Sequence, residues 1–407
     1  MSQSSEKIDK IELLAKQILN DAGQCRAEGR EDISLSDSMK KISSSCTEIA
    51  SLAATPRNWV IKTACSYTTC MALSIILEFG LQKHIRDGDG TTSLDELVQM
   101  SGVNKEVIKM ALSQCMLSFI FEEPDPEQFR HNDNSRMLLN ENYAAWVQFR
   151  CDDSYTAGAY LTQSLKENNL QIAGEPEKRA WGIAYGTNKS FYEWYNSEDP
   201  VRGRRFDKQM AASLDNATYG VQIEEIFSFD KFQNATLVDV GGGRGQNSIR
   251  LAGRFPGMSF IVQDLYCKND EERVAQLPAN IRDKISWQRH DFTTPQPTKE
   301  ADVYLLSQIL MDHQPDSCRV IVKHLVDAMA PNHSVLLIND YMSPTGDEGK
   351  FTPMNSALNL HMLAILGRAF WSRKEWEGFF ASVSPCLKLR TFNFTGGRVV
   401  FELYKEV

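Results

Sequence analysis

The chain has 407 residues, of which 42% are hydrophobic and 24% charged, and its formal net charge is -9. This length allows two or three domains, and the composition is that of an ordinary globular protein. The acidic balance argues against sequence-independent nucleic-acid binding, which requires a basic surface. Nucleic acid is therefore not an expected partner.

The nine cysteines are scattered along the chain and form no C-x-x-C pair. This spacing predicts free thiols in a reducing compartment, and neither disulfides nor a metal site. Residues 1–10 are polar and mixed in charge, unlike a secretory signal. The longest apolar run, residues 71–77, is too short to span a bilayer. We therefore expect a cytoplasmic protein with no membrane partner.

Residues 1–55 are expected to form an N-terminal helical extension. Apolar residues recur at helical spacing over residues 11–22, and a second helix is predicted over 38–53, with a polar loop at 23–37. A long helix is predicted from Pro56 to Gly80. Because it is apolar around most of its circumference, we expect it to be buried on several sides, in a core or at a subunit interface.

Residues 93–136 have the pattern of a winged helix-turn-helix. Ser93 caps a first helix with an acid three residues later, Gly102 forms the turn, and a second helix follows over 105–118. A hairpin is predicted around residues 124–126. The second helix offers few side chains to phosphates or base edges, so packing or dimerisation is favoured over DNA binding. We assign residues 56–174 to a winged-helix dimerisation domain.

From residue 175 onward, strands and helices alternate, which predicts a doubly wound α/β sheet. A hinge is predicted at residues 175–177, and a helix over 206–228 leads into the first strand. Strands are predicted at residues 237–240, 260–262, 285–288, 303–306, 334–339 and 398–403. The expected fold class is therefore a Rossmann-like α/β domain over residues 175–407, preceded by an all-α and winged-helix region.

The first of these strands runs directly into a glycine-rich loop, because residues 236–245 read T-L-V-D-V-G-G-G-R-G. Glycine adopts positive φ angles and lets a ligand approach the backbone closely. A dinucleotide fingerprint would have its last glycine at position 246, which is Gln. The G-x-G-x-G spacing, with Asp239 inside the strand, resembles the S-adenosylmethionine (SAM) loop of class I methyltransferases.

Two acidic segments follow in the order of an adenosyl pocket. Asp264 ends the second strand roughly 20 residues after the glycine loop, where an acid is placed to accept both ribose hydroxyls. Asp291 is suited to hold the edge of an adenine, and Phe292 its face. The predicted cofactor-binding residues are Asp239, Gly241, Gly242, Gly243, Asp264, Leu265, Asp291, Phe292 and Ser307.

A winged helix, an aromatic linker at residues 187–206 and a SAM loop together resemble the plant-type O-methyltransferase superfamily, in particular its fungal secondary-metabolite branch. The resemblance covers nearly the whole chain after Pro56 and is carried by residues 129–132 with Ser135, residues 238–245 and the segment after Tyr304. It implies SAM as cofactor, a homodimer formed through the N-terminal domain, and a small polyketide-derived substrate.

The chain departs from this family where proton transfer takes place. Family members usually read I-L-H-D-W after the fourth strand, and the His removes a proton from a phenol or enol. Here residues 309–313 read I-L-M-D-H, so the position of the base is Met311, followed by Asp312 and His313. The turn at 366–371 lacks the usual acid, and Ser307 stands where a basic residue usually meets the SAM carboxylate. The cofactor pocket is expected to be intact and the proton-transfer residues to be absent.

Two functions follow from this combination. The methyltransferase-fold pericyclases, of the leporin type, imply dehydration or pericyclic cyclisation (hetero-Diels–Alder or Alder-ene) of a polyketide or pyridone alcohol, with SAM stabilising charge. The alternative is SAM-dependent O-methylation of a small phenolic or polyketide product, with His313 as the base or with an acidic substrate. A helix would turn His313 about 200° away from Met311, so we rank the pericyclase first. A catalytically inactive SAM-sensing partner is a third option.

The candidate catalytic residues are His131, Asp312, His313 and His361. Each also has a structural interpretation: a wing histidine for His131, a helix-start residue for Asp312 and His313, and core packing for His361. Methionine suits an apolar pocket for an irregular substrate, although it is equally common in cores. The predicted substrate pocket consists of Phe191, Arg205, Met210, Met311, Asn359 and Met362.

Overall fold

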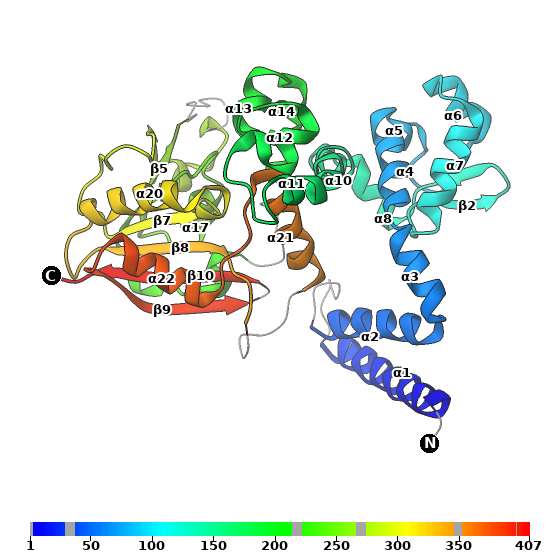
Figure 1. Cartoon of the computed structure of the whole chain (residues 1–407), viewed down its shortest axis with the longest axis horizontal. Coiled ribbons are helices and arrows are strands. Elements are labelled where there is room, and N and C mark those ends of the chain that lie inside the picture. The colour runs from blue at the N-terminus through cyan, green and yellow to red at the C-terminus, as the bar shows by residue number, and fades with distance from the viewer. Residues whose placement is uncertain (1–2, 29–36, 214–221, 266–273, 346–351, 396) are drawn as a thin grey trace. The chain divides into compact units, whose positions relative to one another are not determined.

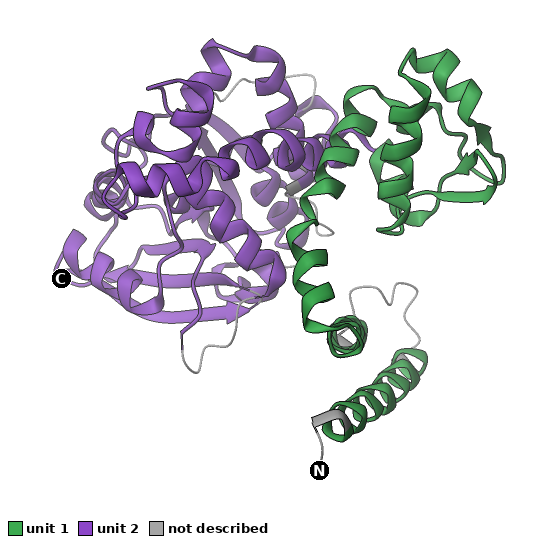
Figure 2. Cartoon of the chain, turned by 45° about the vertical axis from the view of Figure 1, so that its right-hand side comes forward, with its two compact units in different colours: residues 1–139 green, residues 140–407 purple. Residues whose placement is uncertain are grey.

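The computed structural model describes residues 3–28, 37–213, 222–265, 274–345, 352–395 and 397–407. It contains two compact units, Met1–Leu139 and Asn140–Val407, coloured green and purple in Figure 2. The finer domain boundaries at residues 55 and 174 stay predictions. No disulfide joins the eight cysteines that lie among the described residues.

Unit 1 begins with two long helices, α1 (Gln3–Glu28) and α2 (Asp37–Ala53), which pack against each other. Helix α1 is longer than predicted, since it continues through Gly23, which the sequence analysis had assigned to a loop. The residues after Gly23 are good helix formers, and Cys25 is buried, so packing extends the helix past the glycine. Helix α2 is confirmed.

The predicted long apolar helix is divided into α3 (Pro56–Ala64) and α4 (Tyr67–Glu78). At the break, the hydroxyls of Ser66 and Thr68 each donate a 2.8 Å hydrogen bond to a preceding carbonyl, which competes with the helical pattern. The prediction that this segment is buried is wrong within this chain. None of the residues of α3, all of them described, is buried, and α4 buries Ala72, Ile76 and Leu77.

The segment Pro56–Glu78 is also more apolar than the sequence analysis inferred from residues 71–77. By length and composition alone it would be sufficient to cross a membrane, and only 22% of its most apolar window is buried. The segment also contains Arg57, Asn58, Lys62 and several serines and threonines, so no long apolar run marks it in the sequence. The result is a large exposed apolar surface on unit 1, which bears on the subunit-interface interpretation.

The winged helix is confirmed. Its elements are α5 (Leu81–His84), β1 (Thr92–Ser93), α6 (Leu94–Ser101), α7 (Lys105–Met116), β2 (Glu122–Asp125), β3 (Gln128–Arg130), α8 (Asp133–Arg136) and the short helix η1 (Met137–Leu139). Ser93 and Glu96 form the predicted capping box, and Gly102 ends α6 in the left-handed region at φ 70. The strands pair in the order β1-β3-β2.

Unit 2 opens with a helical region rich in aromatic residues. It contains α9 (Glu141–Phe149), the π-helical turn η2 (Arg150–Ser154), α10 (Tyr155–Ala159), α11 (Leu161–Glu167), η3 (Pro176–Lys178), α12 (Ala180–Tyr185), α13 (Phe191–Ser197), α14 (Pro200–Ser213), α16 (Ile223–Ile226) and η4 (Asp230–Phe232). The helix predicted over 206–228 is wrong at both of its ends, and its middle, residues 214–221, lies outside the described residues. Helix α14 starts at Pro200, which favours the first helical position, and Phe227 is already extended and buried.

The described strands of unit 2 form a seven-stranded sheet in the order β6-β5-β4-β7-β8-β10-β9 (Figure 1). The strands are β4 (Thr236–Val240), β5 (Ser259–Asp264), β6 (Ile285–Arg289), β7 (Val303–Ser307), β8 (Val335–Tyr341), β9 (Leu387–Thr395) and β10 (Arg398–Lys405). All pairs from β6 to β8 are parallel, and β10 is antiparallel to both neighbours. The six predicted strands are confirmed.

The edge strand β9 was not predicted. Its apolar residues change phase between Leu389 and Phe392, opposite an irregularity between Glu402 and Leu403 in β10. A strand with such an irregularity loses the strict alternation on which the sequence pattern depends. Strand β9 is the outermost strand of the sheet and lies next to β10. It is therefore held in the sheet by its pairing with β10, and not by burial of both of its faces.

Side chains of the central strands alternate between two hydrophobic cores, as the pleat of a sheet requires. Val238, Leu306 and Ile338 belong to one core, which contains residues of α20 (Pro315–Ala328) and α22 (Arg373–Val383). Leu237 and Leu305 belong to the other, which contains residues of α16 and α17 (Gln246–Arg254). The remaining helices are α19 (Ala279–Arg282), η5 (Leu310–Asp312) and α21 (Pro353–Leu366). Helices therefore cover both faces of the sheet, as a doubly wound fold requires.

Candidate functional site

The glycine loop lies at the carboxyl end of β4, where doubly wound sheets bind their ligands. Gly241, Gly243 and Gly245 have φ angles of 73, 56 and 71, which favour glycine. A Cβ at Gly241 would lie 2.6 Å from Ile309 Cδ1, and one at Gly245 would lie 2.5 Å from Trp287. The loop is therefore closely surrounded by side chains of β6 and of the segment after β7.

Asp239, at the base of this loop, is 1% exposed. Its Oδ2 accepts a 2.7 Å hydrogen bond from Ser248 Oγ, while Oδ1 is buried without a partner among the described residues. Burial raises the pKa of Asp239 to about 6. A buried oxygen with unused accepting capacity beside a glycine loop fits a ligand that brings donors, such as an ammonium or a nucleoside hydroxyl.

Asp264 ends β5, and its Oδ2 accepts a 3.0 Å hydrogen bond from the amide of Gly243. This contact ties the predicted ribose acid to the glycine loop. Asp291 Oδ1 accepts from both the amide and the hydroxyl of Thr293, at 2.9 and 2.7 Å, and these bonds lower its pKa. Leu265, after Asp264, is 39% exposed. The cofactor roles of these residues stay predictions.

Phe292 lies against the glycine loop, since its ring would be 3.4 Å from a Cβ at Gly241. Its ring meets that of His313 edge to face, at 5.4 Å between centroids. Burial lowers the pKa of His313, which weakens it as a proton acceptor at neutral pH. The structure thus brings Phe292, Ile309 and His313 together around Gly241, from two segments that follow different strands.

The segment after β7 is held in place by an acid that the sequence analysis missed. Asp340, 1% exposed, accepts a 3.1 Å hydrogen bond from the amide of Met311 and a 2.7 Å bond from that of Tyr341. Burial raises the pKa of Asp340 to about 7. Its signal was present in the sequence, since Asn339 and Asp340 directly follow the apolar part of a central strand.

Asp312 is hydrogen-bonded to a phenol from a distant helix. Tyr192 OH, on α13, donates a 2.6 Å hydrogen bond to Asp312 Oδ2. Asp312 Oδ1 has no hydrogen-bond partner in the described part of the chain, and Asp312 is half-buried. Burial raises the pKa of Asp312 to about 6. Tyr192 was noted in the sequence only as part of an aromatic stretch.

Beside this pair lies a mainly aromatic group of buried side chains, which we call the aromatic cluster. It consists of Phe149, Trp181, Phe191, Tyr195, Met362 and Phe370. Met311 packs against it, so three predicted substrate-pocket residues, Phe191, Met311 and Met362, come together. Asn359 Oδ1 accepts a 2.8 Å hydrogen bond from the amide of Phe370. The cluster is apolar and densely packed.

His361 borders the aromatic cluster, and its ring lies 5.5 Å from that of Phe149. Its Nδ1 is buried and has no partner among the described residues. Desolvation, with a smaller contribution from Arg150, lowers the pKa of His361 well below its ordinary value. His361 is therefore neutral at pH 7 and retains hydrogen-bonding capacity.

Arg205, Met210 and His131 complete the set of predicted site residues. Arg205 is paired with Asp152 and with the fully buried Asp153, at 2.9 and 2.8 Å. Met210 is 40% exposed on α14. His131 belongs to unit 1, where Nδ1 lies 3.0 Å from Ser135 Oγ and Nε2 lies 2.9 Å from Gln82 O. Both ring nitrogens of His131 are thus engaged within unit 1, and its catalytic role stays a prediction.

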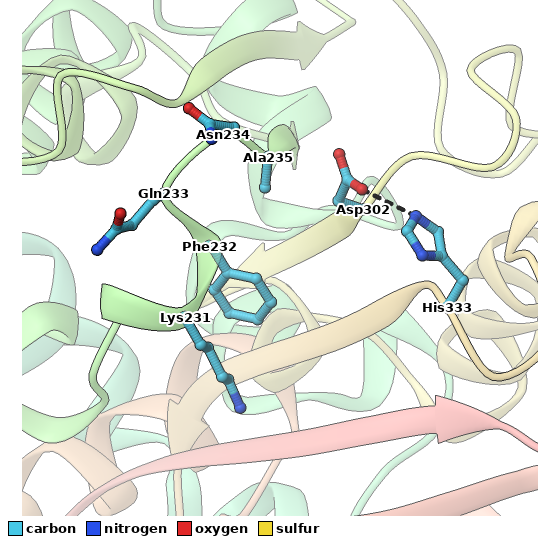
Figure 3. Close-up of a pocket in the computed structure, with 7 residues that line it drawn as sticks. All are labelled: Lys231, Phe232, Gln233, Asn234, Ala235, Asp302 and His333. Atoms are coloured by element: carbon cyan, nitrogen blue, oxygen red, sulfur yellow. Dashed lines mark hydrogen bonds and ion pairs between the residues drawn. The ribbon is translucent and has the colours of Figure 1, made fainter.

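A cavity of about 410 Å³ lies at the opposite end of the sheet from the glycine loop. Figure 3 shows its lining residues, Lys231, Phe232, Gln233, Asn234, Ala235, Asp302 and His333. His333 Nε2 lies 2.8 Å from Asp302 Oδ1, whose other oxygen accepts from the amide of Thr236. The cavity borders the start of β4, whereas the predicted site lies at its end.

Comparisons with known proteins agree with this geometry. A family model described as an O-methyltransferase domain matches residues 159–383. The N-methyltransferase nanE of Aspergillus nanangensis is 33% identical over 97% of this chain and 98% of its own length. The O-methyltransferase xanE of Aspergillus fumigatus is 35% identical over 86% of this chain and 80% of its own.

Among solved structures, LepI in complex with SAM superposes with a TM-score of 0.80 and 20% identity, covering 99% of this chain and all of LepI. OxaC, bound to S-adenosylhomocysteine (SAH) and oxaline, has a TM-score of 0.80 and 18% identity, covering 98% of this chain and all of OxaC. At sequence identities of 20% and 18%, the structural similarity shows that the fold is shared and nothing more. The glycine cradle and the unused oxygen of Asp239 fit SAM as the cofactor. The chain belongs to the SAM-dependent O-methyltransferase family.

Proposed function

We propose that this enzyme transfers the methyl group of SAM to an oxygen or nitrogen nucleophile of a small secondary metabolite. The single observation that carries the proposal is the Tyr192–Asp312 hydrogen bond of 2.6 Å. It holds a carboxylate with one unused oxygen next to Met311, where the family usually has its basic histidine. Relatives that are at least 33% identical over most of the chain and are named as N- or O-methyltransferases support the same chemistry.

In this proposal, SAM supplies an electrophilic methyl group on a positively charged sulfur. Asp312 accepts the proton that the nucleophile releases, using Oδ1, while Tyr192 holds Oδ2 by its hydrogen bond. The raised pKa of Asp312, about 6, makes this carboxylate a stronger base than an exposed aspartate. Met311, which is half-buried and packs against the buried aromatic cluster, supplies an apolar contact for the body of the substrate, and His361 a neutral hydrogen-bonding group.

A nitrogen nucleophile would place a smaller demand on Asp312. A neutral amine attacks through its free lone pair, so its proton is lost after the methyl group has moved. The absence of a histidine at Met311 is compatible with such a substrate, and the relative nanE is named as an N-methyltransferase. The proposal therefore includes both oxygen and nitrogen acceptors.

The pericyclase that the sequence analysis ranked first is kept as the second candidate. Met311 favours it, because a thioether is not a proton acceptor at neutral pH. A solved structure described as a pericyclic reaction enzyme also shares the fold, with a TM-score of 0.77 at 19% identity. We rank it second because Asp312, a catalytic candidate already in the sequence, has an unused carboxylate oxygen that can accept a proton, and because the more similar relatives are named methyltransferases.

One experiment separates these two functions. The purified enzyme is incubated with methyl-labelled SAM and candidate phenols, amines and polyene alcohols. Label on the organic product with equimolar SAH supports methyl transfer. Conversion of an alcohol to a cyclised product without label or SAH, and with SAM retained, would contradict it and establish the second candidate.

We also infer that the enzyme is a homodimer whose subunits meet through α3 and α4. Val60, Ile61 and Met71 are 66%, 50% and 49% exposed, although they belong to the segment Pro56–Glu78, which is long and apolar enough to cross a membrane. A monomer rarely leaves such a surface uncovered. The family resemblance stated above implies the same mode of association.

A further inference from the structure

A continuous hydrogen-bonded network crosses the carboxyl edge of the sheet next to the glycine loop, and Ser307 is at its centre. Ser307 Oγ accepts a 3.1 Å hydrogen bond from Asn247 Nδ2, on α17, and a 2.9 Å bond from Asn339 Nδ2, on β8. Ser307 is the last residue of β7, and it is paired directly with Asn339 in the sheet. The family usually has a basic residue at this position.

The orientation of both asparagine amides is determined by arginines on their far sides. Arg250 Nη2 donates to Asn247 Oδ1 at 2.9 Å, and Arg398 Nη2 donates to Asn339 Oδ1 at 3.0 Å. A guanidinium can only donate, so each amide must turn its oxygen to the arginine and its NH₂ group to Ser307. Neither amide can be flipped without losing both of its hydrogen bonds.

This arrangement leaves Ser307 with one unused function. A hydroxyl oxygen has two acceptor lone pairs and one proton to donate. Both lone pairs are taken by the asparagines, and no acceptor for the proton lies within hydrogen-bond distance among the described residues. Ser307 is only partly buried, so the hydroxyl proton is available to a ligand that brings an acceptor oxygen.

Two arginines stand behind the amides that contact Ser307. Arg398 is 5% exposed, stacks on Tyr341 at 4.9 Å and forms no salt bridge within the described part of the chain. Arg250 is neutralised in part by Glu224, at 2.6 Å. Each arginine withdraws electron density through an amide toward itself, which makes the Ser307 proton a better donor. The glycine loop is close by, because Ile309, two residues after Ser307, is the side chain nearest to Gly241.

We propose that Ser307 is the donor to the carboxylate at the amino-acid end of the cofactor, and that Asn247, Asn339, Arg250 and Arg398 are positioning residues that orient and polarise it. A neutral hydroxyl backed by two arginine–amide pairs thus replaces the basic side chain of the family. The inference rests on the cofactor, which both candidate functions share, and not on the reaction catalysed. The test below can therefore fail while the proposed function holds, and the proposed function can fail while Ser307 still binds the cofactor.

The test compares two ligands that differ in the carboxylate. SAH carries the complete amino-acid end, whereas 5′-methylthioadenosine has the same nucleoside and sulfur without it. We expect Ser307→Ala to weaken SAH binding about 10- to 100-fold, the usual effect of losing a hydrogen bond to a charged group. The affinity of this variant for 5′-methylthioadenosine, measured by titration calorimetry, should stay unchanged. An unchanged affinity for this ligand shows that the pocket is still folded.

Three further variants complete the test. Ser307→Thr keeps the hydroxyl and should retain SAH affinity. Ser228→Ala is the matched control, because among the described residues its hydroxyl bonds only to the exposed Asp230. Arg250→Met should weaken SAH severalfold, because Asn247 is then free to turn. Equal losses for both ligands in Ser307→Ala, no loss for either, or a Ser307→Thr variant as weak as the alanine would each overturn the proposal.

Discussion

The phenol of Tyr192 and the carboxylate of Asp312 are joined by a 2.6 Å hydrogen bond although they lie 120 positions apart in the chain. If Asp312 accepts the proton, Asp312→Asn should lower kcat about 10²- to 10⁴-fold, the usual range for general-base catalysis. Tyr192→Phe should cost less, because the carboxylate remains. Steady-state kinetics check both. Asp316→Asn, an exposed acid four residues away, is the matched control, and equal activities in all three variants would contradict the assignment.

The same pair predicts a pH dependence. Asp312 must be ionised to accept a proton, so kcat should rise as pH increases through about 6, the raised pKa of this carboxyl. The bond from Tyr192 lowers that pKa, so Tyr192→Phe should move the acidic limb of the profile to higher pH. A pH–rate profile measures both effects. If the acidic limb of the pH–rate profile is still present in Asp312→Asn, a group other than Asp312 causes it.

Stability should also depend on pH, through Asp340. Its pKa is raised from 3.8 to about 7 in the folded protein, so the folded state binds more protons between these values. The contribution of Asp340 to the free energy of unfolding therefore falls as pH rises, by about 2 kcal/mol between pH 5.5 and 7.5. Urea unfolding at the two pH values should show a smaller difference in Asp340→Asn than in wild type. An unchanged difference would refute the assignment.

The two glycines Gly241 and Gly243 offer a matched test of the cofactor cradle. Both have positive φ, so alanine brings similar backbone strain to each, roughly 1 kcal/mol. Only at Gly241 would the new Cβ meet a side chain, Ile309 at 2.6 Å, whereas nothing lies within 4 Å at Gly243. Gly241→Ala should therefore weaken SAH binding more than about tenfold relative to Gly243→Ala. Similar affinities would place the ligand away from this turn.

The proposed dimer can be tested on α3. Val60 and Ile61 are 66% and 50% exposed, so aspartate at both positions should not disturb the fold of the monomer. We expect this double variant to be monomeric by light scattering, because two charges would be buried at the interface. Leu170→Asp, at a 75% exposed residue of unit 2, should leave the oligomeric state unchanged. A wild-type protein that is itself monomeric would end the proposal.

Much of this architecture follows from local sequence patterns. The six predicted strands, the capping box at Ser93 and the turn at Gly102 depend on residues within a few positions of each other, so alternation and capping identify them. The predictions of secondary structure that were wrong also have local causes. Strand β9 carries an irregularity, and α3–α4 is interrupted by hydroxyls that bond to the backbone. The exposure of α3 could not be foreseen, because hydrophobicity alone does not say whether the same chain covers it.

The fold class, the glycine cradle for SAM and the replacement of the expected base by Met311 can each be predicted from neighbouring residues. Which groups meet around these features depends on the tertiary structure. Tyr192 reaches Asp312 from a distant helix, and Ser307, Asn339 and Arg398 come together from β7, β8 and β10. These contacts depend on the order of strands in the sheet and on helix packing, which place residues side by side without regard to their separation along the chain.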